Sequence, residues 1–196
     1  MKIQVGTGDV YLEGFVNTDV HIPGYSFLAR ERPDLVEVNR TTFEHYYKHP
    51  YSLTGPLDRL CVADAFMDAR ALTFSDECCE FLVAVQVLEH FTPCEALKAL
   101  REWRRVLRLG GTLFVDTLDF LGLATLAMTD SSPDEEEYFF RMIYGSHKNA
   151  YACHKDGYSH RKLTELLLLA GFDGVRSLDN PLGHPYPSLT FEAKRS

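Results

Sequence analysis

The sequence predicts an α/β fold of the doubly wound type, in which helices cover an open, mostly parallel sheet. Three observations predict it. A short strand at Lys2–Val5 ends in a glycine turn, residues 80–85 form the strongest apolar strand, and an amphipathic helix leads through two glycines into another buried strand. A continuous apolar run is typical of a parallel strand covered on both faces. Strands that alternate with helices indicate βαβ units.

Composition limits the class of protein. The chain has 196 residues, 45% of them hydrophobic, and a formal net charge of −8. This length predicts a single domain, residues 1–196, with a full core. The acidic balance argues against a nucleic-acid partner, because that affinity rests on many Lys and Arg contacts to phosphate. No basic leader precedes an apolar run and no stretch is long enough to span a membrane, so we expect a soluble, cytoplasmic protein without a membrane partner.

The cysteines predict neither a disulfide framework nor a metal site. They are odd in number, and two of them are adjacent, which does not fit the spacing of a zinc ligand pair. We therefore expect reduced thiols at Cys61, Cys78, Cys79, Cys94 and Cys153. No group of His, Asp and Glu has convincing ligand spacing either, so no metal is expected.

The first strand leads into the turn Gly6-Thr7-Gly8, and the next apolar run ends at Asp19. Glycine is needed where the backbone takes positive φ or approaches a ligand closely. Open α/β sheets bind ligands outside the carboxyl ends of their strands, where an acidic side chain can accept hydrogen bonds from ribose hydroxyls. We interpret the pattern as half of a nucleoside pocket, the alternative being an ordinary tight turn. Residues 9–14 are too few for a crossover helix, so a loop replaces it.

Residues 21–58 are irregular and rich in aromatic side chains. They allow two interpretations, a packed excursion or a lid whose aromatics line a substrate pocket. Within them we expect one helix over Ser26–Arg32 and another around Thr42–Lys48. A strand is predicted at Arg59–Ala63, ending at Asp64-Ala65.

The most regular helix is predicted over Pro93–Leu107, where apolar residues recur on one face. Thr92 and Glu95 form a predicted capping box at its start. At its end we expect Gly110-Gly111 to form a left-handed cap and lead into a strand over Thr112–Thr117.

After Asp119 the sequence is less regular, and residues 121–158 are a second candidate lid or substrate segment. A helix with an acidic start is predicted over Asp134–Tyr144. Ser159 is expected to cap a helix over His160–Ala170. Two strands, over residues 174–178 and 188–194, close the chain.

Two stretches carry a family resemblance. Leu88-Glu89-His90-Phe91, followed by the run Glu102 to Leu113, resembles the "LEHF…E.RRVLKPGG.L" segment of the class I S-adenosylmethionine (SAM) dependent methyltransferases. The N-terminal Gly-x-Gly…Gly-Phe-Val-Asn-Thr-Asp is similar to a bacterial branch of predicted methyltransferases, which reads GCG…GWINVD and has the same short loop. The resemblance implies a Rossmann-like class I methyltransferase fold: a mostly parallel seven-stranded sheet with an antiparallel C-terminal strand and a loop in place of the first crossover helix.

The resemblance also implies SAM as the cofactor and assigns its contacts by position. The expected cofactor-binding residues comprise the glycine turn, the acidic strand ends and the end of the central strand. Gly6 and Gly8 meet the methionine and ribose, Asp19 holds the ribose hydroxyls, Asp64 and the Ala65 backbone face the adenine edge, and Ala84, Val85 and Gln86 lie under the sulfonium.

Methyl transfer depends mainly on placing the nucleophile and excluding water, and a base helps only if the acceptor must lose a proton. The catalytic candidates are His90 and Asp119, of which Asp119 follows a strand on the expected ligand side. Further side chains expected near the strand ends are Tyr144, His147 and His154. For Glu89 and His90 the alternative is that they only hold the segment after the strand by hydrogen bonds.

The expected function is transfer of a methyl group from SAM to an oxygen or nitrogen of a small-molecule acceptor, such as a sugar or another biosynthetic intermediate. Two alternatives stay open, a non-catalytic SAM-binding or regulatory protein and another nucleotide-binding Rossmann-like enzyme, for example one that binds NAD. The latter needs Gly-x-Gly-x-x-Gly opening a helix, whereas position 11 is Tyr in a short loop. A homodimer whose partner closes the site is also left open.

Overall fold

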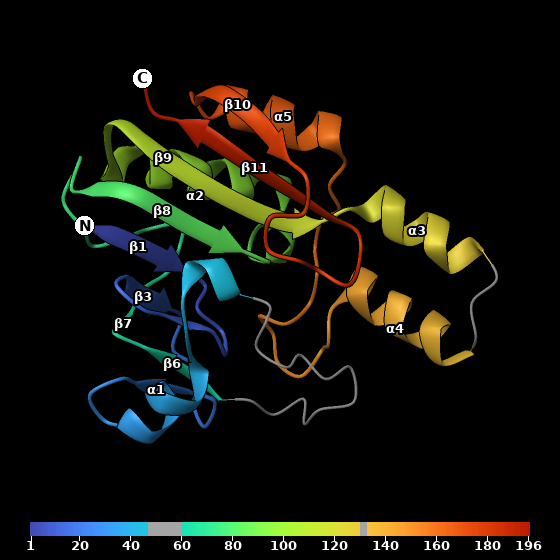
Figure 1. Cartoon of the computed structure of the whole chain (residues 1–196), viewed down its shortest axis with the longest axis horizontal. Helices are drawn as coiled ribbons and strands as arrows, with labels where there is room; N and C mark the ends of the chain where they lie inside the picture. The colour runs from blue at the N-terminus through green and yellow to red at the C-terminus, as the bar shows by residue number, and fades with distance from the viewer. Residues whose placement is uncertain (47–59, 130–132) are drawn as a thin grey trace.

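The computed structural model describes residues 1–46, 60–129 and 133–196 and contains a seven-stranded sheet (Figure 1). Its order across the sheet is β10-β11-β9-β8-β1-β3-β7. The bounds are β1 (Lys2–Val5), β3 (Val16–Asp19), β7 (Ala65–Phe66), β8 (Cys79–Val85), β9 (Leu107–Leu118), β10 (Asp173–Leu178) and β11 (Ser188–Lys194). Of these seven strands, only β11 runs antiparallel to the others; it pairs with β10 and β9. This arrangement confirms the predicted fold class.

Side chains of the central strands alternate between two cores. Leu82 and Ala84 of β8 pack with α2 (Pro93–Val106) and α5 (His160–Leu169), which lie behind the sheet in Figure 1. Val83 and Val85 face the opposite way, as the two-residue period of a strand requires. On that face the covering residues come from the segment after β1 and include Val10, Leu12 and Tyr46. Only residues 6–15 connect β1 to β3, and they contain no helix. A loop therefore takes the place of the first crossover helix, as predicted.

The described residues between Tyr11 and Ala63 form elements that differ from those predicted from the sequence. They contain two small parallel sheets, β2 (Tyr11–Leu12) with β5 (Arg40–Thr41) and β4 (Ser26–Leu28) with β6 (Cys61–Ala63). The helix predicted over Ser26–Arg32 is therefore wrong, because pairing with β6 holds its first residues extended. The helix present is α1 (Pro33–Asn39), and the second predicted helix is the single turn η1 (Phe43–His45). The rest of that prediction, residues 47–48, lies outside the described residues.

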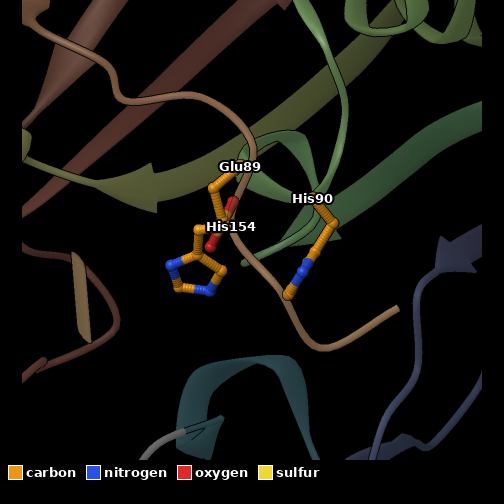
Figure 2. Close-up of side chains that lie close together, drawn as sticks. All are labelled: Glu89, His90 and His154. Atoms are coloured by element: carbon orange, nitrogen blue, oxygen red, sulfur yellow. The ribbon is translucent and has the colours of Figure 1, made fainter. Parts of the chain in front are cut away.

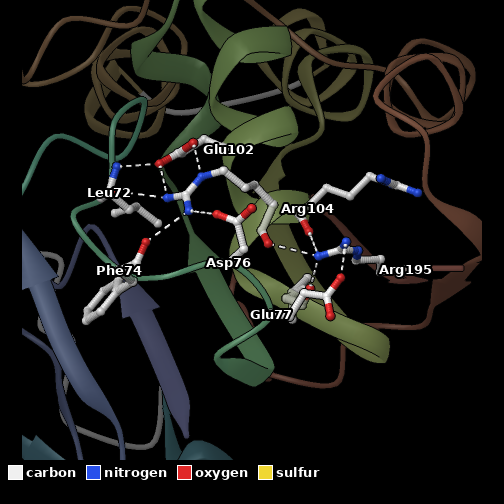
Figure 3. Close-up of polar contacts among 9 residues, drawn as sticks. Leu72, Phe74, Asp76, Glu77, Glu102, Arg104 and Arg195 are labelled. Carbon is white, nitrogen blue, oxygen red and sulfur yellow. Dashed lines mark hydrogen bonds and ion pairs between the residues drawn. The ribbon is translucent and has the colours of Figure 1, made fainter.

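The ends of α2 show one confirmed and one wrong prediction. At its start Glu95 Oε2 accepts from the backbone N–H of Thr92, as a capping box requires. At its end the helix stops at Val106, and Leu107 is already extended at the start of β9. Gly110 has φ +72° but lies within β9, so the predicted glycine cap is wrong. Instead, the Arg195 guanidinium donates to the carbonyls of Arg104, Arg105 and Leu107 (Figure 3).

Beyond the carboxyl ends of β8 and β9 lie the helices α3 (Phe120–Met128) and α4 (Pro133–Tyr144) (Figure 1). The expectation of irregular structure after Asp119 is wrong over α3, whose apolar residues pack against the segment 157–158 and α4. Of the two candidate lid segments, residues 47–58 and 130–132 lie outside the described residues. A short turn, η2 (Leu88–His90), follows β8.

Two composition-based expectations can be compared with the structure. The five cysteines, all within the described residues, are free, as predicted. Among the residues that the structure describes, no helix is long and apolar enough to cross a membrane.

Candidate functional site

The glycine turn and Asp19 meet at the carboxyl ends of β1 and β3. The backbone N–H of Gly8 donates to Asp19 Oδ2 at 2.7 Å, and Val20 N–H donates to Oδ1 at 2.7 Å. Gly6 and Gly8 both have positive φ, 68° and 55°. Burial raises the pKa of the Asp19 carboxyl, whereas the hydrogen bonds from Gly8 and Val20 oppose that rise. The predicted nucleoside half-site is therefore a bonded unit of backbone and carboxylate.

Gly6 and Gly8 have different surroundings. A Cβ on Gly6 would lie 2.5 Å from Cγ2 of Val87, so the turn packs directly against the segment that follows β8. A Cβ on Gly8 would meet no atom of the described residues within 4 Å. Gly6 is thus required by close packing, whereas the space beside Gly8 is open to a ligand.

Asp64 has structural partners. Tyr11 Oη donates to its Oδ1 at 2.7 Å, and Asn17 N–H donates to its Oδ2 at 2.8 Å. Burial and the bond to Asp64 raise the pKa of Tyr11 to about 12. The carboxylate fixes the short loop that replaces the first helix, so both oxygens already have a partner. Ala65 begins β7 and pairs with Thr18 of β3.

The end of β8 is tied to its neighbour β9. Ala84 and Val85 are buried, while Gln86 takes φ 55° and donates both its backbone N–H and its side-chain amide to Asp116. Asp116 is buried and lies 2.9 Å from Nε2 of the buried His184. Sequence analysis missed this pair, although one acidic residue inside the apolar run of β9 was a signal for it.

A second polar cluster forms where η2 follows β8. One ligand-type atom each from Glu89, His90 and His154 lies within 4.8 Å of the others (Figure 2). The two imidazole rings are 4.8 Å apart between centroids and nearly perpendicular. The structure thus brings the catalytic candidate His90 together with His154, which is distant in sequence, and with Glu89.

Backbone contacts bring these side chains together. The Glu89 carbonyl accepts from Lys155 N–H at 2.7 Å, directly after His154. Glu89 Oε2 accepts from Thr117 Oγ1 at 2.8 Å, and His90 Nδ1 lies 3.3 Å from the Cys153 carbonyl. Glu89 therefore does hold the segment after the strand, as one alternative proposed, but its side chain also enters the cluster.

Burial keeps the cluster neutral. It raises the pKa of Glu89 to about 8 and, with the neighbouring His154, lowers that of His90 to about 4. Burial also lowers the pKa of His154. Glu89 Oε1 and His154 Nδ1 are buried without a hydrogen-bond partner. Both residues line a cavity of about 10 Å³, closed by residues of α3 and α4 that include Phe120, Leu123, Met142 and Ile143.

The remaining candidates lie at the same end of the sheet with different exposure. Asp119 follows β9 as the N-cap residue of α3, and its N–H donates to the Pro187 carbonyl at 3.2 Å. Tyr144 is 59% exposed, and His147 is also exposed. Neither joins the buried cluster, whereas Asp119 lies between two residues that line its cavity, Leu118 and Phe120.

Comparison with solved structures defines the class of this fold. A SAM-dependent methyltransferase from Thermotoga maritima is similar over 100% of this chain and 81% of its own, with 16% identity and a TM-score of 0.52. One from Methanosarcina mazei is similar over 99% and 91%, with 16% identity and a TM-score of 0.56. PigF with SAH is similar over 100% of this chain but only 50% of its own, with 16% identity and a TM-score of 0.52. The fold is therefore that of the Rossmann-like methyltransferases.

Sequence comparison adds a match over part of the chain. Residues 55–115 match the model of a family described as a methyltransferase domain. No curated protein matches the sequence. The match covers 61 of the 196 residues, so the methyltransferase activity that it and the shared fold indicate is taken up below as a proposal.

Proposed function

We propose that the chain is a SAM-dependent methyltransferase that acts on an oxygen or nitrogen of a small-molecule acceptor bound at the carboxyl ends of β8 and β9. The observation that carries the proposal is the contact between the two half-sites. Gly6, in the nucleoside half-site, packs on Val87, two residues before Glu89 of the polar cluster. A cofactor seated on the glycine turn would therefore lie beside side chains able to bind a polar acceptor.

The residues present fit SAM. The space beside Gly8 is open, and Asp19 Oδ1 accepts one hydrogen bond, from Val20, although a carboxylate oxygen has two lone pairs. Asp19 would hold the ribose hydroxyls, and the backbone of Gly6 and Gly8 would border the methionine part. We assign the adenine edge to the Ala65 backbone, with Asp64 positioning the loop below it.

The sulfonium of bound SAM supplies an activated methyl group. The protein therefore has to place the acceptor, exclude water and, where the acceptor loses a proton, accept that proton. Ala84, Val85 and Gln86 would form the floor under the sulfonium. Asp119 is the acceptor-side carboxylate in this proposal. His90 is neutral near pH 7, and because its Nδ1 faces a carbonyl, the lone pair is on Nε2, where it can bind the acceptor side.

The proposal is tested by calorimetric titration of the full chain with SAM, S-adenosylhomocysteine and NAD. Asp19→Asn should weaken both SAM forms by roughly tenfold or more, because a lost hydrogen bond to a buried polar group costs about 1 to 3 kcal/mol. Asp173→Asn, at an exposed position on β10, is the matched control and should leave binding unchanged.

Each other outcome decides between the alternatives. Binding of NAD alone would contradict the proposal in favour of another nucleotide enzyme. Binding of SAM without methyl transfer to any member of a panel of hydroxyl and amine acceptors would favour the non-catalytic binder. Unchanged affinity in folded Asp19→Asn would remove the ribose assignment.

A further inference from the structure

The cluster at the end of β8 combines one carboxylate with two imidazoles. We propose that Glu89, His90 and His154 bind one divalent transition-metal ion of the zinc and iron(II) type. Three potential ligand atoms of the correct kinds already lie within 4.8 Å of one another. Two histidines and one carboxylate are the ligand set that such ions take in sites with open positions.

The side chains are oriented by partners outside the cluster. Thr117 Oγ1 donates to Glu89 Oε2 at 2.8 Å, which leaves Oε1 for an ion. The Cys153 carbonyl can only accept, so His90 Nδ1 carries the proton and Nε2 carries the lone pair. Metal-binding histidines typically donate their other ring N–H to a carbonyl or carboxylate in this way. The outer contacts of a metal site are therefore present here.

Two buried atoms have no other explanation in the described structure. Glu89, which is 1% exposed, leaves Oε1 without a partner, and His154 leaves Nδ1 without one. An unpaired buried polar atom is costly, so a group that only held the fold would be expected to pair. Yet among the hydrogen bonds and ion pairs of the described residues, none joins Glu89 to either imidazole. A bound cation would satisfy both atoms at once.

The space also suits an ion. Glu89 and His154 line the cavity of about 10 Å³, which is about the volume needed for one water-sized occupant. Ligand atoms bound at about 2.0 to 2.2 Å lie roughly 3 to 4 Å apart, so contraction by about 1 Å completes the site. Three protein ligands leave open coordination positions, where an acceptor hydroxyl would release its proton to water more readily. That last role rests on the proposed methyl transfer, whereas binding of the metal does not.

The test uses the chelator-treated full chain titrated with Co²⁺, followed by absorption spectroscopy, and with Zn²⁺, followed by calorimetry. We expect one ion per chain, with a Co²⁺ ligand-field spectrum. Glu89→Gln, which is nearly isosteric, and His154→Ala should each weaken binding at least tenfold. His147→Ala removes an exposed histidine of the same loop and should leave affinity unchanged.

Circular dichroism identifies any variant that fails to fold, and Glu89→Gln then decides alone. The proposal is overturned if folded wild-type protein binds neither ion, or if His147→Ala weakens binding while Glu89→Gln does not. SAM affinity, measured on the same samples, separates the two proposals. Intact SAM binding without metal binding rejects only the metal site, whereas metal binding without SAM binding rejects only the proposed function.

Discussion

Two polar clusters lie at opposite ends of the sheet, and they differ in how their groups are paired. At the amino end, all three guanidinium nitrogens of Arg105 are bonded, to Glu102, Asp76 and the carbonyls of Leu72 and Phe74. At the carboxyl end, Glu89 and His154 each leave a buried atom unpaired. The charged residues at the amino end therefore satisfy one another, whereas the cluster at the carboxyl end keeps unpaired atoms, which we have proposed bind an ion.

The positions of the clusters agree with this division. Ligands of open α/β sheets bind outside the carboxyl ends of the strands, so the amino end is free to be a closed network. There the Arg105 side chain ties the turn before β8 to α2, and Arg195 ties the C-terminus to the end of α2 and to Glu77 (Figure 3). The fully bonded Arg105 guanidinium thus lies at the amino end, and the unpaired atoms of Glu89 and His154 lie at the carboxyl end.

The largest expected effect is that of a metal ion on stability. Zn²⁺ at about 100 times its Kd should raise the free energy of unfolding by about 2.7 kcal/mol, and a chelator should reverse the gain. Urea unfolding with and without Zn²⁺ measures it. At the same Zn²⁺ concentration Arg105→Met should keep this increment, and Glu89→Gln, which binds at least tenfold more weakly, should lose about half of it or more. If Zn²⁺ raises the free energy of unfolding equally in both variants, the proposed difference between the two clusters is contradicted.

Arg105→Met should come next, lowering the free energy of unfolding by about 2 kcal/mol, because it leaves Glu102 without its charged partner. The same urea experiment measures it, and Arg101→Met on the exposed face of α2 is the control. SAM affinity should stay within about twofold, since the site lies at the other end of the sheet. A large loss of SAM affinity in folded Arg105→Met would contradict the separation.

The sequence predicted the regular elements better than the contacts between segments that are distant in sequence. The apolar run of β8, the Thr92–Glu95 box and the glycine turn each depend on neighbours in sequence, and all three were found. The cap on α2 was missed because its donor, Arg195, is about 90 residues away. Local patterns cannot show which distant side chain reaches a helix end.

The candidate site shows the same limit. Glu89 and His90 were singled out from a motif, and His154 from its place near the strand ends, but no ligand spacing joined them. Their meeting depends on the pairing of Lys155 N–H with the Glu89 carbonyl, which folds a distant loop back onto η2. Likewise, β4 pairs with β6, so Ser26–Leu28 is extended despite its predicted helix.

A smaller effect is expected for Tyr11→Phe, which tests a polar group at the carboxyl end that is already paired. Removing the hydroxyl deprives Asp64 Oδ1 of its donor, so the free energy of unfolding should fall by about 1 kcal/mol. SAM affinity should fall only a few-fold, because the loop is loosened and no proposed contact is removed. Calorimetry and urea unfolding measure the two quantities. Tyr151→Phe, at an exposed position, is the control.

The smallest expected effect is the pH dependence of the Arg105 network. The hydrogen bonds from Arg105 lower the pKa of Glu102 below its ordinary value of 4.5. A lowered folded-state pKa gives stability that is fully present above 4.5 and lost as pH falls through the folded value. The difference in free energy of unfolding between wild type and Arg105→Met should therefore be widest near pH 7 and narrow below pH 4.5. Carboxyl groups that do not contact Arg105 have the same surroundings in both proteins, so their contributions cancel in this difference. If the difference in free energy of unfolding between the two proteins stays constant down to the acid transition, Arg105 stabilises the fold through its carbonyl contacts rather than through Glu102.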